Sequence, residues 1–219
     1  MTATSADGRR VGVVGGTFDP PHIGHLIVAS EARWQLGLDE VRLVPAREPP
    51  HKPDRLPAPP EARLRWLERA IDGREGRVGS RAEIDRPGPS YTADTLERMA
   101  AGEPGAHLWF VLGSDQLEGF AGWHDPGRIL RLARLAVVPR AGADPEAVRA
   151  LADRVAPGRA DWLDVPAVAV SSTMIRARIA AGLPIAFLVP RGVEEALAEE
   201  GLVASPRIGP TERRPRDIA

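Results

Sequence analysis

The sequence predicts one α/β domain in which a doubly wound, mainly parallel sheet carries helices on both faces. Short apolar runs alternate with stretches of helical periodicity, which is the pattern of βαβ units. The first apolar run ends in a glycine pair, and a short loop then leads into a helix. No internal repeat or linker divides the 219 residues, a length that suits one buried core. Together these observations indicate a Rossmann-like domain.

The individual elements follow from the positions of apolar residues and turn residues. Strands are predicted at residues 10–16, 41–45, 107–112, 135–138 and 162–165, with a weaker one at 77–84. Helices are predicted at residues 23–36, 64–71, 92–101, 146–154, 171–181 and 193–200. Residues 46–60, rich in proline and charge, are predicted to be a loop. The domain is expected to span residues 10–204, between a flexible start at 1–9 and a disordered polar tail at 205–219.

Composition excludes several functional classes. The chain has no cysteine, which rules out disulfides, cysteine-ligated zinc and thiol nucleophiles. A formal net charge of −1 gives no reason to expect nucleic-acid binding, whereas small anionic ligands need only a local basic patch. Neither a membrane-spanning apolar run nor a signal peptide is visible, so no membrane association and a cytoplasmic location are expected. A homo-oligomer is compatible with this composition.

The first predicted loop has the composition of a phosphate site. Residues 15–26 read GGTFDPPHIGHL, in which Gly15 and Gly16 allow a sharp turn and close approach of a ligand. The loop leads into a helix N-terminus, which favours a phosphate group. His22 and His25 lie one turn apart and can both donate to phosphate oxygens. The P-loop and the G-x-G-x-x-G motif are both absent. A zinc site formed by this histidine pair with Asp19 is the weaker alternative.

Three further segments follow predicted strands, where ligands of parallel sheets bind. Asp115 comes just after the strand at 107–112, so its carboxylate is either a ribose ligand or a helix N-cap. Residues 171–173, Ser-Ser-Thr, begin a helix with Arg176 one turn in, which is either an anion site or a plain cap with a solvated arginine. Trp123, in an irregular stretch, is either a core residue or a stacking platform.

Six motifs occur in one order over roughly residues 10–192 and carry a family resemblance. They are GGTFDPPHIGHL (15–26), PPHK (49–52), PSYTADTL (89–96), GSD (113–115) followed by Trp123, VPR (138–140) and SSTMIR (171–176). With these motifs the sequence resembles the H-x-G-H nucleotidyltransferase superfamily and, within it, bacterial nicotinate-nucleotide adenylyltransferase. It departs from the family at Ser114, where alanine is frequent, and at 194–196, where a tyrosine is frequent.

The resemblance implies transfer of AMP from ATP to nicotinate mononucleotide, giving nicotinate adenine dinucleotide and pyrophosphate in NAD biosynthesis, without a covalent intermediate. Since the attacking phosphate oxygen is already anionic, catalysis needs positioning and charge stabilisation and no general base. The implied catalytic residues are His22, His25 and Arg176. The implied ATP ligands are Gly15, Gly16, Thr17, Phe18, His22, His25, Gly113, Asp115, Ser171, Ser172, Thr173 and Arg176. The implied mononucleotide ligands are Asp19, Lys52, Tyr91, Thr92, Trp123 and Arg140.

Within that set, Trp123 is expected to stack on the pyridine ring, and the backbone at Tyr91 and Thr92 is expected to receive the nicotinate carboxylate. Mg²⁺ is expected to arrive with ATP and to keep water and phosphate ligands, so no protein ligand is assigned to it. The alternatives are nicotinamide mononucleotide or phosphopantetheine as acceptor, a cytidylyl donor, or a non-catalytic nucleotide-binding regulator. The presence of His22, His25 and Arg176 argues against the regulator.

Overall fold

A computed structural model describes residues 8–49, 57–140 and 142–203 and contains one six-stranded sheet. All strand pairs in this sheet are parallel, in the order β3-β2-β1-β4-β5-β6. The strands are β1 (Arg10–Gly16), β2 (Glu40–Pro45), β3 (Arg77–Gly79), β4 (His107–Gly113), β5 (Ala133–Val138) and β6 (Ala160–Trp162). The predicted α/β class and parallel sheet are therefore confirmed.

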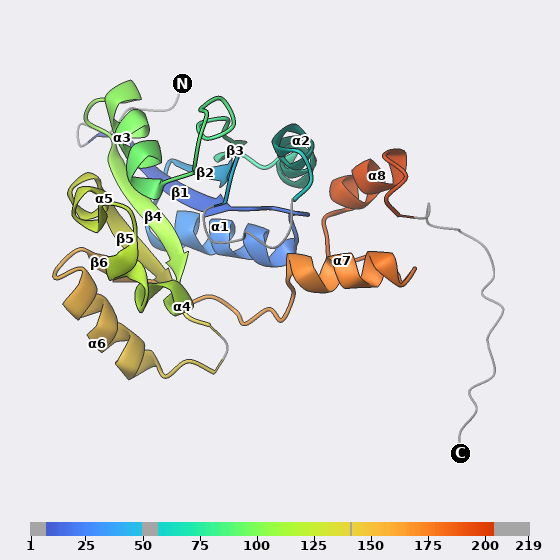
Figure 1. Cartoon of the computed structure of the whole chain (residues 1–219). Coiled ribbons are helices and arrows are strands. Elements are labelled where there is room, and N and C mark those ends of the chain that lie inside the picture. The colour runs from blue at the N-terminus through green and yellow to red at the C-terminus, as the bar shows by residue number, and fades with distance from the viewer. Residues whose placement is uncertain (1–7, 50–56, 141, 204–219) are drawn as a thin grey trace, which may run out of the picture.

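Helices cover both faces of the sheet (Figure 1) and pack into two separate hydrophobic cores. The first core takes α1 (Ile23–Gln35), α2 (Pro60–Ile71), α7 (Ser172–Ala180) and α8 (Arg191–Glu199). The second takes α3 (Thr92–Gly102), the short α4 (Ser114–Leu117), the 3₁₀ turn η1 (Phe120–Gly122), α5 (Pro126–Leu132) and α6 (Pro145–Val155). Strand β4 serves both cores by alternation, with Leu108 and Phe110 on one face and Trp109 and Val111 on the other.

Two predicted strands were wrong in extent. The strand predicted at 77–84 ends at Gly79, because the chain then turns and the Asp85 N–H donates to the Arg81 carbonyl at 3.0 Å. The strand predicted at 162–165 lies at Ala160–Trp162, because pairing with β5 begins at Ala160 after the turn at Gly158 (φ 66°).

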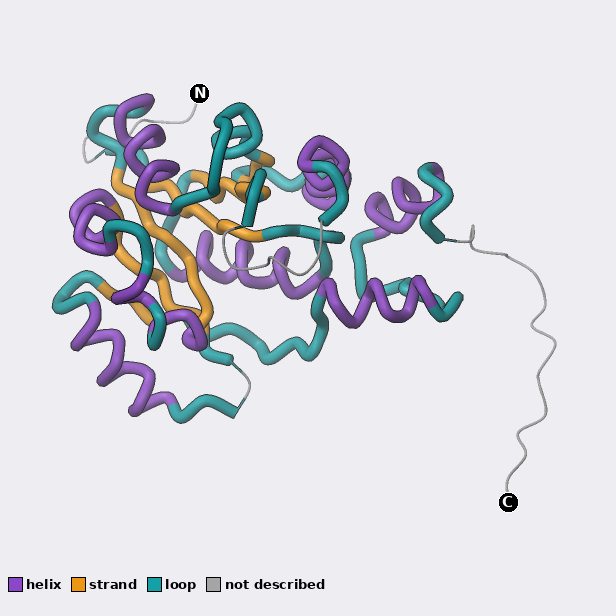
Figure 2. Tube along the Cα trace, viewed as in Figure 1, coloured by secondary structure: helices purple, strands orange, loops and turns teal. Residues whose placement is uncertain are grey.

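Residues 114–132 form three short elements that the sequence analysis did not predict, α4, η1 and α5 (Figure 2). None is long enough to show an apolar period. α5 begins at Pro126, and the carboxylate of Asp125 accepts the Arg128 N–H at 3.0 Å as its N-cap. These elements place Trp123 between η1 and α5, with its ring near that of Phe110 in β4.

The strand order reverses between β1 and β4, so the crevice expected for a ligand lies at their carboxyl ends. The chain leads outward from β1 through β2 to β3, and from β4 through β5 to β6. Residues 1–7, part of the predicted flexible start, and the predicted tail at 205–219 lie outside the described residues. Within the described ranges, no helix is long and apolar enough to cross a membrane.

Candidate active site

The two predicted phosphate-binding histidines lie in contact at the start of α1. The backbone N–H of His22 donates to Nδ1 of His25 at 3.1 Å, and the two rings stack with centroids 3.7 Å apart. Phe18, buried and in the left-handed region (φ 52°), packs its ring against that of His25 at 4.8 Å. Because Nδ1 of His25 accepts a hydrogen bond, its neutral ring carries the proton on Nε2, which is then a donor.

His22 is held in its neutral form. Burial, and secondarily the charge of Arg140, lower the pKa of His22 from 6.5 to about 4. Its side chain is buried, and among the described residues its Nδ1 has no hydrogen-bond partner. Near neutral pH the His22 ring can therefore donate a hydrogen bond to a phosphate oxygen without carrying a charge.

This shift predicts a measurable dependence of stability on pH. As the pH falls, His22 is protonated near pH 6.5 in the unfolded chain but only near pH 4 in the folded chain. The free energy of unfolding therefore decreases between pH 6.5 and about 4, and His22 causes no further decrease below that pH. The loss is about 3 kcal/mol. His22→Gln removes the titration, so urea unfolding from pH 7 to 4 should show a shallower decrease than in wild type. Parallel curves for the two proteins would refute the assignment.

Helix α7 begins against the first loop. The Ser171 hydroxyl accepts the Met174 N–H at 3.2 Å as a true N-cap, and the Ser172 hydroxyl donates to the Pro20 carbonyl at 2.9 Å. Arg176 donates from Nη1 to the Asp19 carbonyl at 2.7 Å. Of the alternatives left by the sequence, the structure shows the cap at Ser171, and it places Arg176 against the first loop, where it contacts the Asp19 carbonyl.

Arg176 also organises its own helix turn. Its Nη2 lies 3.1 Å from the Thr173 hydroxyl, and its Nη1 lies 3.9 Å from the Asp19 carboxylate, which is buried. The cationic guanidinium therefore stands between the first turn of α7 and the loop that leads into α1. Two helix N-termini and one arginine converge there, which is a favourable environment for a polyphosphate.

On the other side of the crevice, two predicted ligands of different substrates pair with each other. Arg140 meets Asp115 through two contacts, Nε to Oδ1 at 3.0 Å and Nη2 to Oδ2 at 3.3 Å, and its backbone N–H donates to the Ser114 hydroxyl at 3.0 Å. Both charged side chains are exposed. An exposed pair contributes about 1 kcal/mol or less, so ribose hydroxyls and a phosphate are able to replace these contacts.

The aromatic residues gather at the ends of α3 and η1. Tyr91 stacks on His124 with ring centroids 4.3 Å apart. Trp123 is half-buried, 5.9 Å from Phe110 and 5.4 Å from Phe120 between ring centroids. Trp123 is thus packed on the core by part of its ring, and its remaining surface is accessible. The sequence analysis missed His124, whose only signal was its place next to Trp123.

The two backbone N–H groups predicted to bind the nicotinate carboxylate differ in whether they already have a partner. The Tyr91 N–H already donates to the Pro89 carbonyl at 3.1 Å, so this backbone donor is occupied. Thr92 is the first residue of α3, where a helix leaves its N–H without an intrahelical partner. Lys52 lies outside the described residues.

The glycines at the strand ends differ in how closely neighbouring side chains approach them. A Cβ on Gly16 would lie 3.2 Å from the Phe18 ring, and one on Gly113 would lie 2.3 Å from the Asp115 carboxylate. A Cβ on Gly15 would meet the Phe110 ring at 3.6 Å, an ordinary contact. A side chain at Gly16 would press on the buried Phe18 ring, whereas at Gly113 only the tip of the exposed Asp115 side chain would have to move. Gly15 does not need to be glycine for packing.

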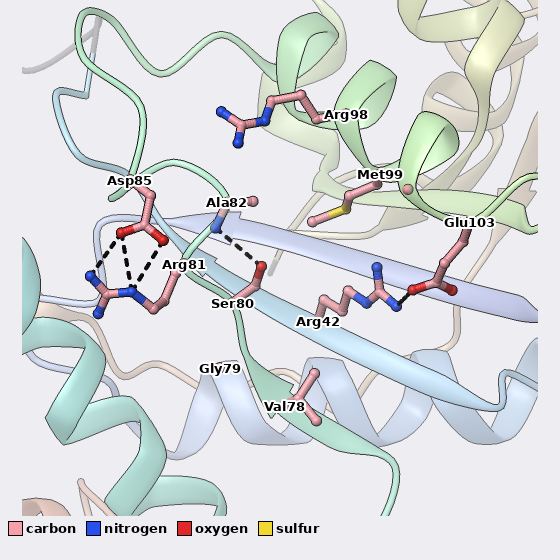
Figure 3. A pocket seen from close by; sticks show the side chains of 11 residues that line it. Arg42, Val78, Gly79, Ser80, Arg81, Ala82, Asp85, Arg98, Met99 and Glu103 are labelled. Atoms are coloured by element: carbon pink, nitrogen blue, oxygen red, sulfur yellow. Dashed lines mark hydrogen bonds and ion pairs between the residues drawn. The ribbon is translucent and has the colours of Figure 1, made fainter.

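Among the described residues there is no group of three His, Cys, Asp or Glu side chains able to hold a metal ion. A hollow of about 410 Å³ lies between β2, β3 and the end of α3 (Figure 3), away from the six motifs. Two of its arginines, Arg42 and Arg81, are paired with Glu103 and Asp85, and Arg98 also lines it.

A cytidylyltransferase-like family matches residues 13–178. A protein of Saccharopolyspora erythraea named "Probable nicotinate-nucleotide adenylyltransferase" is 40% identical over 194 residues, covering 89% of each chain. One of the same name from Paenarthrobacter aurescens is 42% identical over 195 residues, covering 88% of this chain and 90% of its own. The chain belongs to the nicotinate-nucleotide adenylyltransferase family.

Structural similarity agrees with this family at the level of the fold. The Plasmodium falciparum nicotinic acid mononucleotide adenylyltransferase complexed with NaAD superposes with a TM-score of 0.71 at 15% identity, covering 89% of this chain and 97% of that one. This similarity shows that the two chains share a fold. The family shown by the curated relatives is the one that the motifs resemble.

Proposed function

We propose that this chain transfers AMP from ATP to nicotinate mononucleotide, producing nicotinate adenine dinucleotide and pyrophosphate. The observation that carries the proposal is the convergence of the His22–His25 pair and Arg176 on the first loop, at the switch point of the sheet. Two helix N-termini and a fixed guanidinium are suited to a triphosphate. Membership of the nicotinate-nucleotide adenylyltransferase family supports the choice of acceptor.

On the donor side, ATP lies with its phosphates at the start of α1 and α7. An oxygen of the mononucleotide phosphate attacks the α-phosphorus, a new P–O bond forms, and the bond to the bridging oxygen breaks with its electron pair leaving on pyrophosphate. No proton has to move, because the nucleophile is anionic. His25 Nε2–H and the Arg176 guanidinium donate to the phosphate oxygens on which charge builds up, and neutral His22 adds a third donor.

On the acceptor side, the accessible surface of Trp123 stacks on the pyridine ring. The Thr92 N–H at the start of α3 receives the nicotinate carboxylate. Arg140 leaves Asp115 for the mononucleotide phosphate, which frees the Asp115 carboxylate to accept ribose hydroxyls of ATP. The other ATP contacts are assigned to Gly15, Gly16, Thr17, Phe18, Gly113, Ser171, Ser172 and Thr173, and the other mononucleotide contacts to Asp19, Lys52 and Tyr91.

Mg²⁺ use and a cytoplasmic location stay predictions from the sequence. The donor set fits an ion carried by the nucleotide, because the positions around the triphosphate are occupied by donors and cations that favour phosphate. When bound, Mg²⁺ supplies charge neutralisation on the triphosphate.

An acceptor panel tests the substrate assignment. Pyrophosphate release from Mg-ATP is measured with nicotinate mononucleotide, nicotinamide mononucleotide and phosphopantetheine. We expect kcat/KM for the nicotinate compound to exceed the other two by at least about tenfold, equivalent to 1.4 kcal/mol of transition-state binding. A preference for either other acceptor would overturn the substrate, and no release with all three, despite binding of an ATP analogue, would favour the regulator.

A further inference from the structure

An arginine that no motif includes lies buried beneath the first loop. Arg63 of α2 has 0% relative exposure and is the largest fully buried side chain among the described residues. It occupies the apolar face of the helix, next to Leu64 and one turn before Leu67. Burial lowers the pKa of Arg63, although the charges of Asp19 and Glu83 partly oppose this effect. A cation in this position needs a specific reason, because an apolar residue of similar volume would avoid its desolvation.

The contacts of Arg63 supply that reason. Its Nη1 donates to the Thr17 carbonyl at 2.7 Å and its Nε to the Ala58 carbonyl at 2.7 Å. The Ala58 N–H in turn lies 3.4 Å from the Asp19 carboxylate. One guanidinium therefore ties the first loop to residues 57–59, directly before α2. Two residues of α7 hold the same loop further along the chain, since Arg176 donates to the Asp19 carbonyl and Ser172 to the Pro20 carbonyl.

The bond to Thr17 fixes the direction of a backbone donor. In a trans peptide the carbonyl and the following N–H point to opposite sides. With the Thr17 carbonyl held by Arg63 in the interior, the Phe18 N–H is turned away from Arg63. Phe18 has φ 52°, a conformation that a non-glycine residue keeps only when its surroundings hold it.

We propose that Arg63 is a positioning residue for ATP, which orients the Thr17–Phe18 peptide so that the Phe18 N–H donates to the triphosphate. Arg63 does not touch the substrate itself. The expected effect of Arg63 on turnover rests on the proposed function. Its expected effect on nucleotide binding does not, because the binding of a nucleoside triphosphate can be measured without an acceptor.

The test uses two substitutions and a matched control. Arg63→Met keeps the volume and removes every donor, and Arg63→Lys keeps the charge but reaches one carbonyl at most. Arg65→Met is the control, because Arg65 belongs to the same helix, is exposed and pairs with Glu200 at 3.0 Å. The Kd of α,β-methylene ATP and, with nicotinate mononucleotide, kcat and KM for ATP are measured, with thermal unfolding of each protein.

We expect both Arg63 variants to raise the Kd of the analogue and to lower kcat, each by about tenfold or more, equivalent to 1.4 kcal/mol for each quantity. In the Arg65 variant both quantities should stay within about twofold of wild type. KM for the mononucleotide, measured in the same way at saturating ATP, should change little. Folded Arg63→Lys and Arg63→Met proteins with the wild-type Kd and kcat would overturn the proposal, even if their thermal unfolding temperatures fall, because that result assigns Arg63 to stability alone.

Chemical rescue separates positioning from packing. In Arg63→Ala, a guanidinium ion at non-denaturing concentration should restore part of the binding of the analogue, whereas urea, of similar shape and without charge, should not. Equal effects of the two additives would contradict a role for the guanidinium. If wild type binds the analogue yet adenylylates no acceptor, the proposed function fails while these binding measurements still decide the role of Arg63.

Discussion

Replacing His25 with alanine is expected to lower kcat by about 10²- to 10³-fold, the effect of removing one preorganised donor to a transition-state oxyanion. His25 is the ring whose Nδ1 is occupied by the His22 N–H at 3.1 Å, which leaves Nε2 to donate to phosphate. The measurement is pyrophosphate release at saturating ATP and nicotinate mononucleotide, with circular dichroism to confirm the fold.

His25→Ala removes two groups at once, the Nε2 donor to phosphate and the Nδ1 acceptor of the His22 N–H. His25→Asn restores an acceptor oxygen near the position of Nδ1 while still lacking the Nε2 donor, so its kcat should stay low. His107→Ala, which removes an exposed histidine at the other end of β4, serves as control and should keep wild-type activity. Near-normal turnover of His25→Asn would show that His25 acts only as a helix cap.

Replacing Arg176 with methionine is expected to reduce kcat/KM for ATP by about 10²-fold, equivalent to about 2.7 kcal/mol. Two effects combine, since the variant loses a charge at the triphosphate and releases the Asp19 carbonyl that Arg176 holds at 2.7 Å. Arg176→Lys should recover only part of the loss, because an ammonium group cannot reach Thr173 and Asp19 together. Initial rates over a range of ATP concentrations provide the measurement.

A matched control lies on the same helix. Arg178→Met removes a guanidinium whose Nε donates to the Pro184 carbonyl at 2.8 Å, in the turn after α7. This change should leave kcat/KM within about twofold of wild type, because surface substitutions of this kind have small effects. Equal losses in the Arg176 and Arg178 variants would contradict a specific role for Arg176.

Much of the fold was predictable because its signals are local. β1 and the glycine pair precede a helix, so the sequence indicates strand, loop and α1 with nearly correct limits. The apolar spacing of Leu64, Leu67 and Ile71 likewise predicts α2. The elements between β4 and β5 were not predicted, because α4 and η1 span four and three residues, too few to show a period.

The sequence predicted which residues come together at the first loop, but not the contacts that they make. Motif order placed His22, His25 and Arg176 in one site, and the structure brings them to the same loop. Pairing of Asp115 with Arg140 was not predictable, since it depends on how β4 and β5 lie side by side. Arg63 had one signal in the sequence, an arginine on the apolar stripe of a helix, and its partners at Thr17 and Ala58 come only from tertiary structure.

The most direct measurement is the product of the wild-type protein incubated with ATP, Mg²⁺ and nicotinate mononucleotide, quantified by mass spectrometry. The proposed mechanism predicts nicotinate adenine dinucleotide and pyrophosphate in equal amounts, both dependent on the mononucleotide, with no AMP attached to the protein. Pyrophosphate formed without the dinucleotide, or AMP bound covalently to the chain, would contradict direct adenylyl transfer to nicotinate mononucleotide.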